Sequence, residues 1–245
     1  MGLLLYYMHM DIVYIVGEES KNDHIELKYS LRSLKNLTHN KVFISGFLPY
    51  WVSNIFHIST EQIGTKYHNA RDNIRAAARD TRVSSDFMLM NDDFFILKKM
   101  DSVPVYHRGK LADYLKQTNT PGPYRDRIEK TLKILSSLNR LHPMLPTKNK
   151  FSTYNYEMHI PIVVNKQRIL ELAECFPRTS PRAFRSLYCN YFGIAGKKRA
   201  DVKFTPTALR PIPDDFFSTS NNYADTPEFR SWIHQMFPNK CKYEL

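Results

Sequence analysis

The stretch DFMLMNDDFFIL, residues 86–97, contains two apolar runs separated by a polar break at residues 91–93. Residues 86–90 have the length and composition of a buried strand, and residues 94–97 have the pattern of a second strand. The polar break therefore indicates a turn at the carboxyl end of the first strand. Ligands of open α/β sheets bind at this end of the strands, so we expect a functional site at the turn.

Alternating strand and helix patterns precede this stretch. Strands are expected at residues 10–16, 41–45 and 54–58, and helices at residues 24–37 and 67–80. This order predicts an α/β fold with a largely parallel, Rossmann-like sheet flanked by helices. Gly17 ends the first strand as the polar break ends a later one, so we expect one cleft to contain both turns.

The pattern becomes helical and basic after residue 104. Helices are expected at residues 110–117, 124–141, 166–175, 182–191 and 226–237, extended segments at 151–164 and 211–217, and a basic loop at 197–199. We divide the chain into an α/β half at residues 10–105, a helical insertion at 106–150 and a mainly helical, basic half at 151–245. The loop at residues 142–150 is the best internal boundary, and we expect one compact domain overall.

Composition and charge narrow the class of protein. Of the 245 residues, 42% are hydrophobic and 24% are charged, which excludes wholesale disorder, a collagen-like repeat and a coiled coil. Lysine and arginine number 35 against 24 acidic residues, giving a net charge of +11. A surplus of this size favours polyanionic partners such as nucleic acid and nucleotide phosphates.

The cysteines and the start of the chain bear on the compartment. Cys175, Cys189 and Cys241 lack C-x-x-C spacing, which indicates neither a disulfide framework nor a zinc ribbon and favours a reducing compartment. The apolar start at residues 1–16 is interrupted by polar residues and is too short to span a bilayer. We therefore expect a cytoplasmic protein without membrane insertion.

Two adjacent carboxylates at the end of a strand suit a hard divalent cation. Mg²⁺ and Mn²⁺ take a few protein oxygens and complete their coordination with phosphate oxygens and water. A cation held by Asp92 and Asp93 would neutralise a departing diphosphate. The alternative interpretation is an ordinary turn, because asparagine and aspartate are common turn residues.

Four stretches of the sequence resemble conserved regions of Stealth-type capsular polysaccharide phosphotransferases and of shorter, phage-encoded relatives. They are residues 11–14 (DIVY), 25–34 (IELKYSLRSL), 87–96 (FMLMNDDFFI) and 158–161 (MHIP). The resemblance implies a GT-A-like glycosyltransferase fold that transfers a sugar or sugar phosphate from a nucleotide-sugar donor. It further implies that the first half of the chain binds this donor, which we expect to be a UDP-sugar, together with Mn²⁺ or Mg²⁺.

The resemblance also assigns roles within the polar break. Asn91, Asp92 and Asp93 occupy the place of the GT-A acidic motif. Asp93 is the expected metal ligand. Asp92 is expected either as a second ligand or as a catalytic contact to the hydroxyls of the donor sugar, and Asn91 is expected to contact the donor.

Other donor contacts are expected near the first strand and in the preceding helix. Arg71 and Asn73 stand where GT-A-like enzymes place donor contacts, and a guanidinium can grip a diphosphate through two hydrogen bonds. Tyr14 and Gly17 lie at the end of the first strand, where the tyrosine ring could stack on the nucleobase. The alternatives are a solvated helix face for Arg71 and a core position for Tyr14.

Glu157 and His159 are the candidate general bases. They are one residue apart on a strand-like segment, which predicts that their side chains share a face. Either could accept a proton from an acceptor hydroxyl, and His159 could instead be a third metal ligand. A structural histidine is the alternative.

We therefore expect a metal-assisted glycosyltransferase that uses a nucleotide sugar. The net charge favours DNA with a hydroxymethylated base as the acceptor, as in phage DNA modification, with the base extruded from the helix. One alternative is a Stealth-like sugar-1-phosphate or glycosyl transferase acting on an anionic surface polysaccharide. Another is a non-catalytic nucleic-acid-binding protein on a degenerate transferase fold. The expected location is the cytoplasm of a bacterial or phage-infected cell.

Overall fold

The structure, a computed structural model, divides the chain into two compact units. It describes residues 10–18, 22–118, 121–141, 151–176, 182–204 and 214–245. Unit 1 comprises Met1–Val103, His159–Leu170 and Val202–Leu245, and unit 2 comprises Pro104–Met158 and Glu171–Asp201. This division differs from the three consecutive segments that the sequence predicts, because strands from the last third of the chain pair with strands from the first hundred residues.

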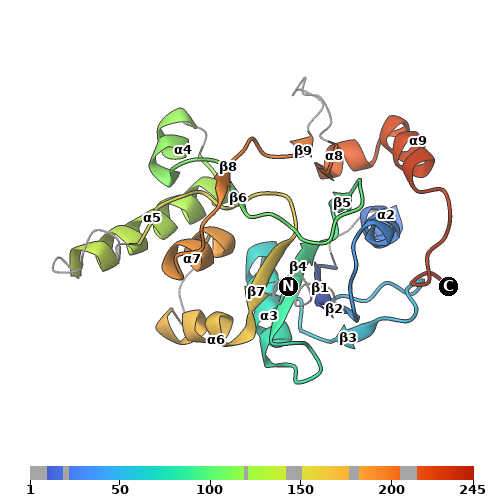
Figure 1. Ribbon diagram of the computed structural model, residues 1–245, viewed down its shortest axis with the longest axis horizontal. Helices are drawn as coiled ribbons and strands as arrows, with labels where there is room; N and C mark the ends of the chain where they lie inside the picture. Colours follow the sequence, from blue (N-terminus) through green and yellow to red (C-terminus); the bar gives the residue numbers. More distant parts are fainter. Residues whose placement is uncertain (1–9, 19–21, 119–120, 142–150, 177–181, 205–213) are drawn as a thin grey trace. The chain divides into compact units, whose positions relative to one another are not determined.

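Unit 1 is built on a five-stranded sheet. Its strands are β1 (Asp11–Val16), β2 (Val42–Gly46), β3 (Phe56–Ile58), β4 (Asp86–Asn91) and β7 (Ile162–Asn165), in the spatial order β3-β2-β1-β4-β7. β1 pairs in parallel with β2 and β4, and β2 pairs in parallel with β3, whereas β7 runs antiparallel to β4 (Figure 1). All six residues of β1 are buried, as its apolar run predicts. The predicted α/β fold with a parallel-rich sheet is confirmed.

Two helices connect the parallel strands. α2 (Ile25–Ser33) links β1 to β2, preceded by the short 3-10 helix η1 (Asn22–His24) and followed by η2 (Leu34–Asn36). α3 (Lys66–Arg79) links β3 to β4 and packs against β1 and β2. The chain leaves β1 toward β2 on one side and returns to β4 on the other, so the strand order reverses between β1 and β4.

A second sheet and two C-terminal helices complete unit 1. The sheet has the order β5-β10-β9 and consists of β5 (Phe94–Ile96), β10 (Phe216–Thr219) and β9 (Lys203–Phe204); α8 (Asn221–Ala224) and α9 (Pro227–Met236) follow. Thr226 caps α9 by accepting a hydrogen bond from the backbone N–H of Phe229. Phe95, Phe217 and Phe229 are buried together there, and each such ring contributes about 1.5–3 kcal/mol when fully buried.

Unit 2 is mainly helical. It contains α4 (Leu111–Gln117), α5 (Pro123–Leu141), α7 (Phe184–Tyr191) and the parallel pair β6 (Tyr106–His107) and β8 (Lys197–Lys198); the division between the units falls within α6 (Lys166–Cys175). α5 packs against both α4 and α7. Among the described helices, none is both long and apolar enough to cross a membrane.

Two sequence-based expectations in this region need correction. Within the expected extended segment 151–164, only residues 162–164 lie in a strand, as part of β7, because β4 offers them a pairing edge. Residues 197–198, expected in a loop, form β8 because β6 supplies a partner strand. The expected boundary at residues 142–150 and the first part of the expected extended segment 211–217 lie outside the described residues.

Candidate functional site

The carboxyl ends of β1 and β4 meet at one edge of the main sheet. Ile15 pairs with Asn91, so Gly17 and the turn at residues 91–93 follow neighbouring strands. Because the strand order reverses between these two strands, this edge has the topology at which α/β sheets bind ligands. The structure therefore brings together the two turns that the sequence placed in one cleft.

Three acidic side chains, which we call the carboxylate cluster, gather next to this edge. Asp92 and Asp93 form the turn between β4 and β5, and Glu26 lies in the first turn of α2. Burial, followed by the charges of Asp92 and Asp93, raises the pKa of Glu26 to about 9. Burial and the charge of Asp93 raise the pKa of Asp92 to about 7, against the opposing effects of backbone N–H groups and Lys203.

The second sheet holds Asp93 in place. The hydroxyl of Ser218, on β10, donates a 2.8 Å hydrogen bond to Asp93 Oδ2. The ammonium group of Lys203, on β9, lies 3.6 Å from the same oxygen. Asp93 thus has both a positioning partner and a neighbouring positive charge.

The carboxylate cluster has a buried oxygen without a partner among the described residues, and it does not form a metal site by itself. Glu26 Oε1 is buried and has no hydrogen-bond partner among the described residues. Across the same residues, no group of three or more His, Cys, Asp or Glu side chains is arranged to hold a metal ion by itself. A cation bound by one or two of these carboxylates would therefore need phosphate oxygens or water to complete its coordination, which is the usual behaviour of Mg²⁺.

Arg71 lies on α3 and is already paired. Its Nε and Nη2 donate to the carboxylate of Asp72 at 2.8 and 2.9 Å, and its side chain is 30% exposed. Arg75 stands one turn later on the same face: burial, and next the charge of Arg71, lowers its pKa. To serve as the predicted donor contact, Arg71 would have to exchange Asp72 for a diphosphate.

Asn73 braces the carboxyl end of β1. Its side-chain Nδ2 donates to Val16 O at 3.2 Å, and its Oδ1 accepts hydrogen bonds from Thr60 and Gln62. The contact between Asn73 and Val16 requires a glycine at position 46. With φ at 116°, a Cβ on Gly46 would lie 2.0 Å from Val16 O and 2.4 Å from Asn73 Nδ2. Since both ends of its amide are used, Asn73 is placed to shape the edge of the sheet rather than to contact a donor directly.

Tyr14 and Gly17 have opposite environments. Tyr14 is 0% exposed, and its hydroxyl lies 3.0 Å from Ser30 Oγ. A ring without exposed surface cannot stack on a nucleobase, so the structure places Tyr14 in the core, the alternative considered above. Apart from its chain neighbours, no described residue has an atom within 4 Å of where a Cβ on Gly17 would stand, which leaves space among them beside the end of β1.

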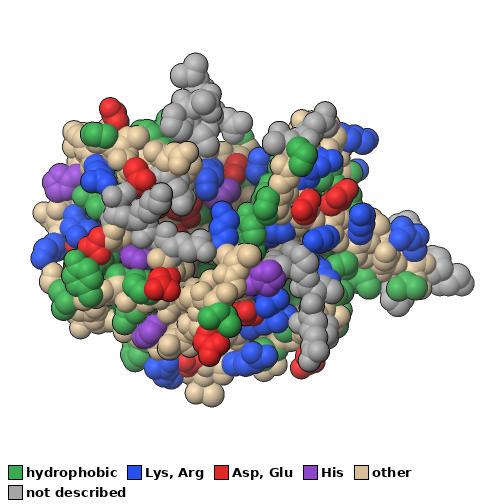
Figure 2. All heavy atoms as spheres, turned by 180° about the vertical axis from the view of Figure 1, so that it is seen from behind, with side chains coloured by type: hydrophobic (Ala, Val, Ile, Leu, Met, Phe, Trp, Pro, Cys, Tyr) green, Lys and Arg blue, Asp and Glu red, His purple; other side chains and the backbone are tan. Residues whose placement is uncertain are grey.

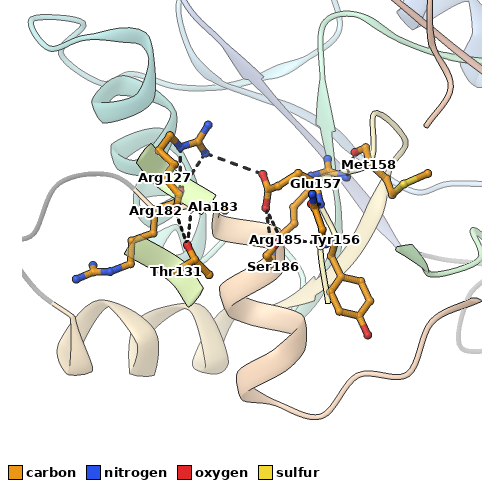
Figure 3. Close-up of polar contacts among 10 residues, drawn as sticks. Arg127, Thr131, Tyr156, Glu157, Met158, Arg182, Ala183, Arg185 and Ser186 are labelled. Atoms are coloured by element: carbon orange, nitrogen blue, oxygen red, sulfur yellow. Dashed lines mark hydrogen bonds and ion pairs between the residues drawn. The ribbon is translucent and has the colours of Figure 1, made fainter. Parts of the chain in front are cut away.

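Glu157 is the centre of a polar network in unit 2 (Figure 3). Its Oε1 accepts hydrogen bonds from the backbone N–H and the hydroxyl of Ser186, at 2.9 and 3.1 Å. Its Oε2 lies 4.0 Å from Nη2 of Arg127, which donates to Arg182 O. These partners occupy the carboxylate, so its geometry is that of a brace between α5 and α7.

The remaining contacts of this network tie α7 to the chain before it. Ser186 Oγ accepts from the backbone N–H of Tyr156, and Arg185 Nη1 donates to Met158 O at 3.0 Å (Figure 3). Thr131 Oγ1 accepts from the backbone N–H of Ala183. The segment that the sequence predicted as a strand is therefore held by side chains instead of a strand ladder.

His159 belongs to unit 1, whereas Glu157 belongs to unit 2. The His159 ring packs edge-on against Phe94 with ring centres 6.2 Å apart. Residues 157–159 are not in a strand, so the argument that alternation places both side chains on one face does not hold. Only His159 remains associated with the unit that carries the carboxylate cluster.

Sequence reasoning missed three residues of this site. Glu26 stands 66 positions before Asp92, and its available signal was an acidic residue in the first turn of the helix that follows the first strand. Lys203 and Ser218 reach Asp93 only through the pairing of the second sheet, which no local pattern encodes.

Comparisons with known proteins do not identify a family for this chain. No protein-family model and no curated protein matches this chain. Among solved structures, 69% of the chain aligns with 43% of the apo form of the glycosyltransferase GlyE from Streptococcus pneumoniae TIGR4, with 12% sequence identity and a TM-score of 0.26. The chain thus spans less than half the length of that protein, and similarity at this level identifies neither a family nor a fold.

Proposed function

We propose that this protein is a nucleotide-sugar-dependent glycosyltransferase. The observation that carries the proposal is the carboxylate cluster, which stands beside the point where the strand order of a parallel sheet reverses. The resemblance of residues 87–96 to an acidic nucleotide-sugar motif points to the same turn. A nucleotide diphosphate and a divalent cation are the ligands that suit this combination of topology and charge.

The roles follow from the geometry of each carboxylate. Asp93, positioned by Ser218, is the proposed ligand of Mn²⁺ or Mg²⁺, and Asp92 or Glu26 supplies a second oxygen. The cation, when bound, offsets the negative charge that develops on the departing diphosphate. Lys203, 3.6 Å from Asp93, adds a positive charge on the same side of the turn. Asn91, exposed at the end of β4, and the open space at Gly17 are the proposed donor contacts.

The proposed acceptor is a hydroxyl group on a polyanion, because the chain carries a net charge of +11. A hydroxymethylated base in DNA is the first candidate, and an anionic surface polysaccharide is the second. Of the two predicted bases we retain His159, since the Glu157 carboxylate accepts two hydrogen bonds from Ser186 and lies 4.0 Å from the Arg127 guanidinium. The mass of the product separates glycosyl transfer, which leaves no phosphate on the acceptor, from sugar-1-phosphate transfer, which leaves one.

A thermal-shift panel tests the donor site. UDP, GDP, CDP and their common sugars are added with and without Mn²⁺ to the wild type, to Asp93→Asn and to Asp101→Asn, which removes an exposed carboxylate from the same unit. A ligand at 100 times its Kd stabilises the fold by about 2.7 kcal/mol. We expect one nucleotide to raise the Tm of the wild type and of Asp101→Asn in a Mn²⁺-dependent way, but not that of Asp93→Asn.

Two results would overturn the proposal. One is the absence of a shift with any nucleotide or nucleotide sugar. The other is an equal shift in Asp93→Asn and the wild type, which would mean that the nucleotide binds away from the carboxylate cluster.

A further inference from the structure

The positive charge of this protein is concentrated in unit 2. The sequence segments of unit 2 contain 16 Lys and Arg against seven Asp and Glu, whereas those of unit 1 contain 19 against 17. Unit 2 therefore carries +9 of the net +11 in about a third of the chain. In Figure 2, Lys and Arg side chains gather over α4 and α5, two of the helices of this unit. Unit 2 is thus the part of the molecule that attracts a polyanion.

Within unit 2, residues 106–110 and 197–199 contain five Lys and Arg residues on a hydrogen-bonded backbone platform, which we call the basic ribbon. In it β6 pairs in parallel with β8, Tyr106 opposite Lys197. The backbone N–H of Arg199 donates to His107 O at 2.9 Å, which extends the pairing by one residue. Asn155 joins the other edge: its N–H donates to Gly109 O, and its C=O accepts from the N–H of Arg108, both at 2.8 Å.

Alternation along the two strands sorts the side chains by face. Because neighbouring residues of a strand point to opposite faces, the register places Tyr106 and Arg108 on the same face as Lys197 and Arg199. The opposite face carries His107, which is buried and stacks on Tyr154 with ring centres 4.3 Å apart. One face of the ribbon thus combines three cations with a tyrosine ring.

Cations and aromatic rings are also in contact on this platform. The guanidinium carbon of Arg199 lies 4.9 Å from the ring centre of Tyr106, and that of Arg108 lies 5.6 Å from the ring centre of Tyr114. Asp201 offsets part of the charge, with its Oδ2 at 3.5 Å from Arg108 Nη1. Lys197 and Lys198 are exposed, so the ribbon keeps a positive surplus at its surface.

We propose that the basic ribbon is a binding surface for single-stranded nucleic acid. Cations spaced along a strand can neutralise successive phosphates, and a ring paired with a guanidinium provides a surface on which a base stacks. An anionic polysaccharide would use the cations but has no base to place against Tyr106. This surface does not depend on the donor site, so the proposal stands or falls independently of the proposed glycosyl transfer.

The test compares two pairs of charge-removing substitutions. Binding of a fluorescently labelled dT20 oligonucleotide is followed by anisotropy over a range of salt concentrations. Lys197→Gln/Arg199→Gln removes two cations from the ribbon, and Lys98→Gln/Lys99→Gln removes two from exposed positions of unit 1. We expect the ribbon pair to weaken binding at low salt about tenfold and to reduce the salt slope by about 1.4, while the control pair changes affinity less than twofold. Circular dichroism melting confirms that each variant is folded.

A second comparison tests the stacking surface. Tyr106→Leu removes the ring and should weaken dT20 binding about fivefold or more, whereas Tyr106→Phe, which keeps the ring, should bind like the wild type. Equal losses in the two charge pairs would overturn the assignment to the ribbon. Wild-type affinity in folded Tyr106→Leu, together with equally tight binding of a sulfated polysaccharide, would overturn nucleic acid as the partner and favour a glycan.

Discussion

Two glutamates, one in each unit, have similar burial and opposite surroundings. Glu157 in unit 2 has an oxygen that accepts two hydrogen bonds from Ser186 and another that faces the guanidinium of Arg127. Glu26 in unit 1 has a buried Oε1 without a hydrogen-bond partner among the described residues, and its nearest charges include two carboxylates. Sequence reasoning named Glu157 as one of two candidate general bases and overlooked Glu26.

The difference teaches how to separate structural from functional carboxylates in this fold. An unsatisfied buried polar group costs about 1–3 kcal/mol, so folding alone favours the arrangement around Glu157. Unit 1 itself shows that pairing is available to buried carboxylates, because Glu244 receives two hydrogen bonds of 2.7 Å from Arg32. A buried carboxyl oxygen that lacks such a partner among the described residues, beside two other carboxyl groups, is what the proposed ligand site would contain.

The largest loss of stability is expected where a buried carboxylate loses the arginine with which it pairs. Arg32 and Glu244 have side chains only 8% and 2% exposed, and Arg32 also donates to Phe237 O. Arg32→Leu leaves the Glu244 carboxylate buried and largely uncompensated, so we expect the free energy of unfolding to fall by about 3–5 kcal/mol. Urea denaturation measures this loss.

Arg82→Leu is the matched control, because Arg82 makes the same kind of two-pronged pair with Asp80 at the surface. Exposed pairs contribute little, so this variant should unfold at nearly the wild-type urea concentration. Similar losses in the two variants would contradict the role assigned to burial.

A smaller loss is expected on removing the brace in unit 2. Glu157→Ala leaves the backbone N–H and hydroxyl of Ser186 without their acceptor and Arg127 without its carboxylate, which should cost about 2 kcal/mol. Glu157→Gln keeps an acceptor oxygen for Ser186 and should lose less. Exposed Glu174, in the same unit, provides the control substitution Glu174→Ala. A Glu157→Ala variant with wild-type stability would return Glu157 to the list of candidate bases.

Sequence reasoning succeeded for elements that depend on neighbouring residues and failed for those that depend on residues far away in the chain. Local patterns were sufficient for β1, β4, the turn at residues 91–93 and α3, because each depends on its own apolar spacing and breakers. They were insufficient for β8, where two lysines become a strand only because β6 lies beside them. They also misled at residues 157–159, where alternation suggested a strand that lacks a partner.

The same limit applies to the site. Asp92 and Asp93 could be selected because an acidic turn after an apolar strand is visible in a short window. Glu26, Lys203 and Ser218 come from three other elements and meet the turn only after the sheets form. Tyr14 shows the converse, since nothing in its own strand distinguishes a buried ring from one that faces a ligand.

A pH series should sharpen the contrast between paired and unpaired carboxylates. Burial alone would raise the pKa of Glu244, but the hydrogen bonds from Arg32 and from the N–H of Cys241 outweigh it and lower that pKa. The stability that this pair provides is therefore complete above the ordinary glutamate pKa and is lost as the pH falls through the lowered value. The wild type should lose more stability than Arg32→Leu between neutral pH and about pH 3. Parallel declines in the two proteins would contradict this assignment.

The smallest stability effect, and the most informative, is expected for Glu26→Gln. Because burial and the neighbouring carboxylates already favour the protonated, neutral form of Glu26, and its Oε1 has no partner among the described residues, replacing it with the neutral glutamine removes no charge at neutral pH and no hydrogen bond of that oxygen. The free energy of unfolding should therefore change by less than about 0.5 kcal/mol, within the range of neutral substitutions. The Mn²⁺-dependent shift with the nucleotide should nevertheless shrink, because a glutamine oxygen carries less charge than the carboxylate that a bound cation favours. A brace like Glu157 would show the reverse pattern, with stability lost and the nucleotide shift intact, so one variant measured in both assays decides which kind of glutamate Glu26 is.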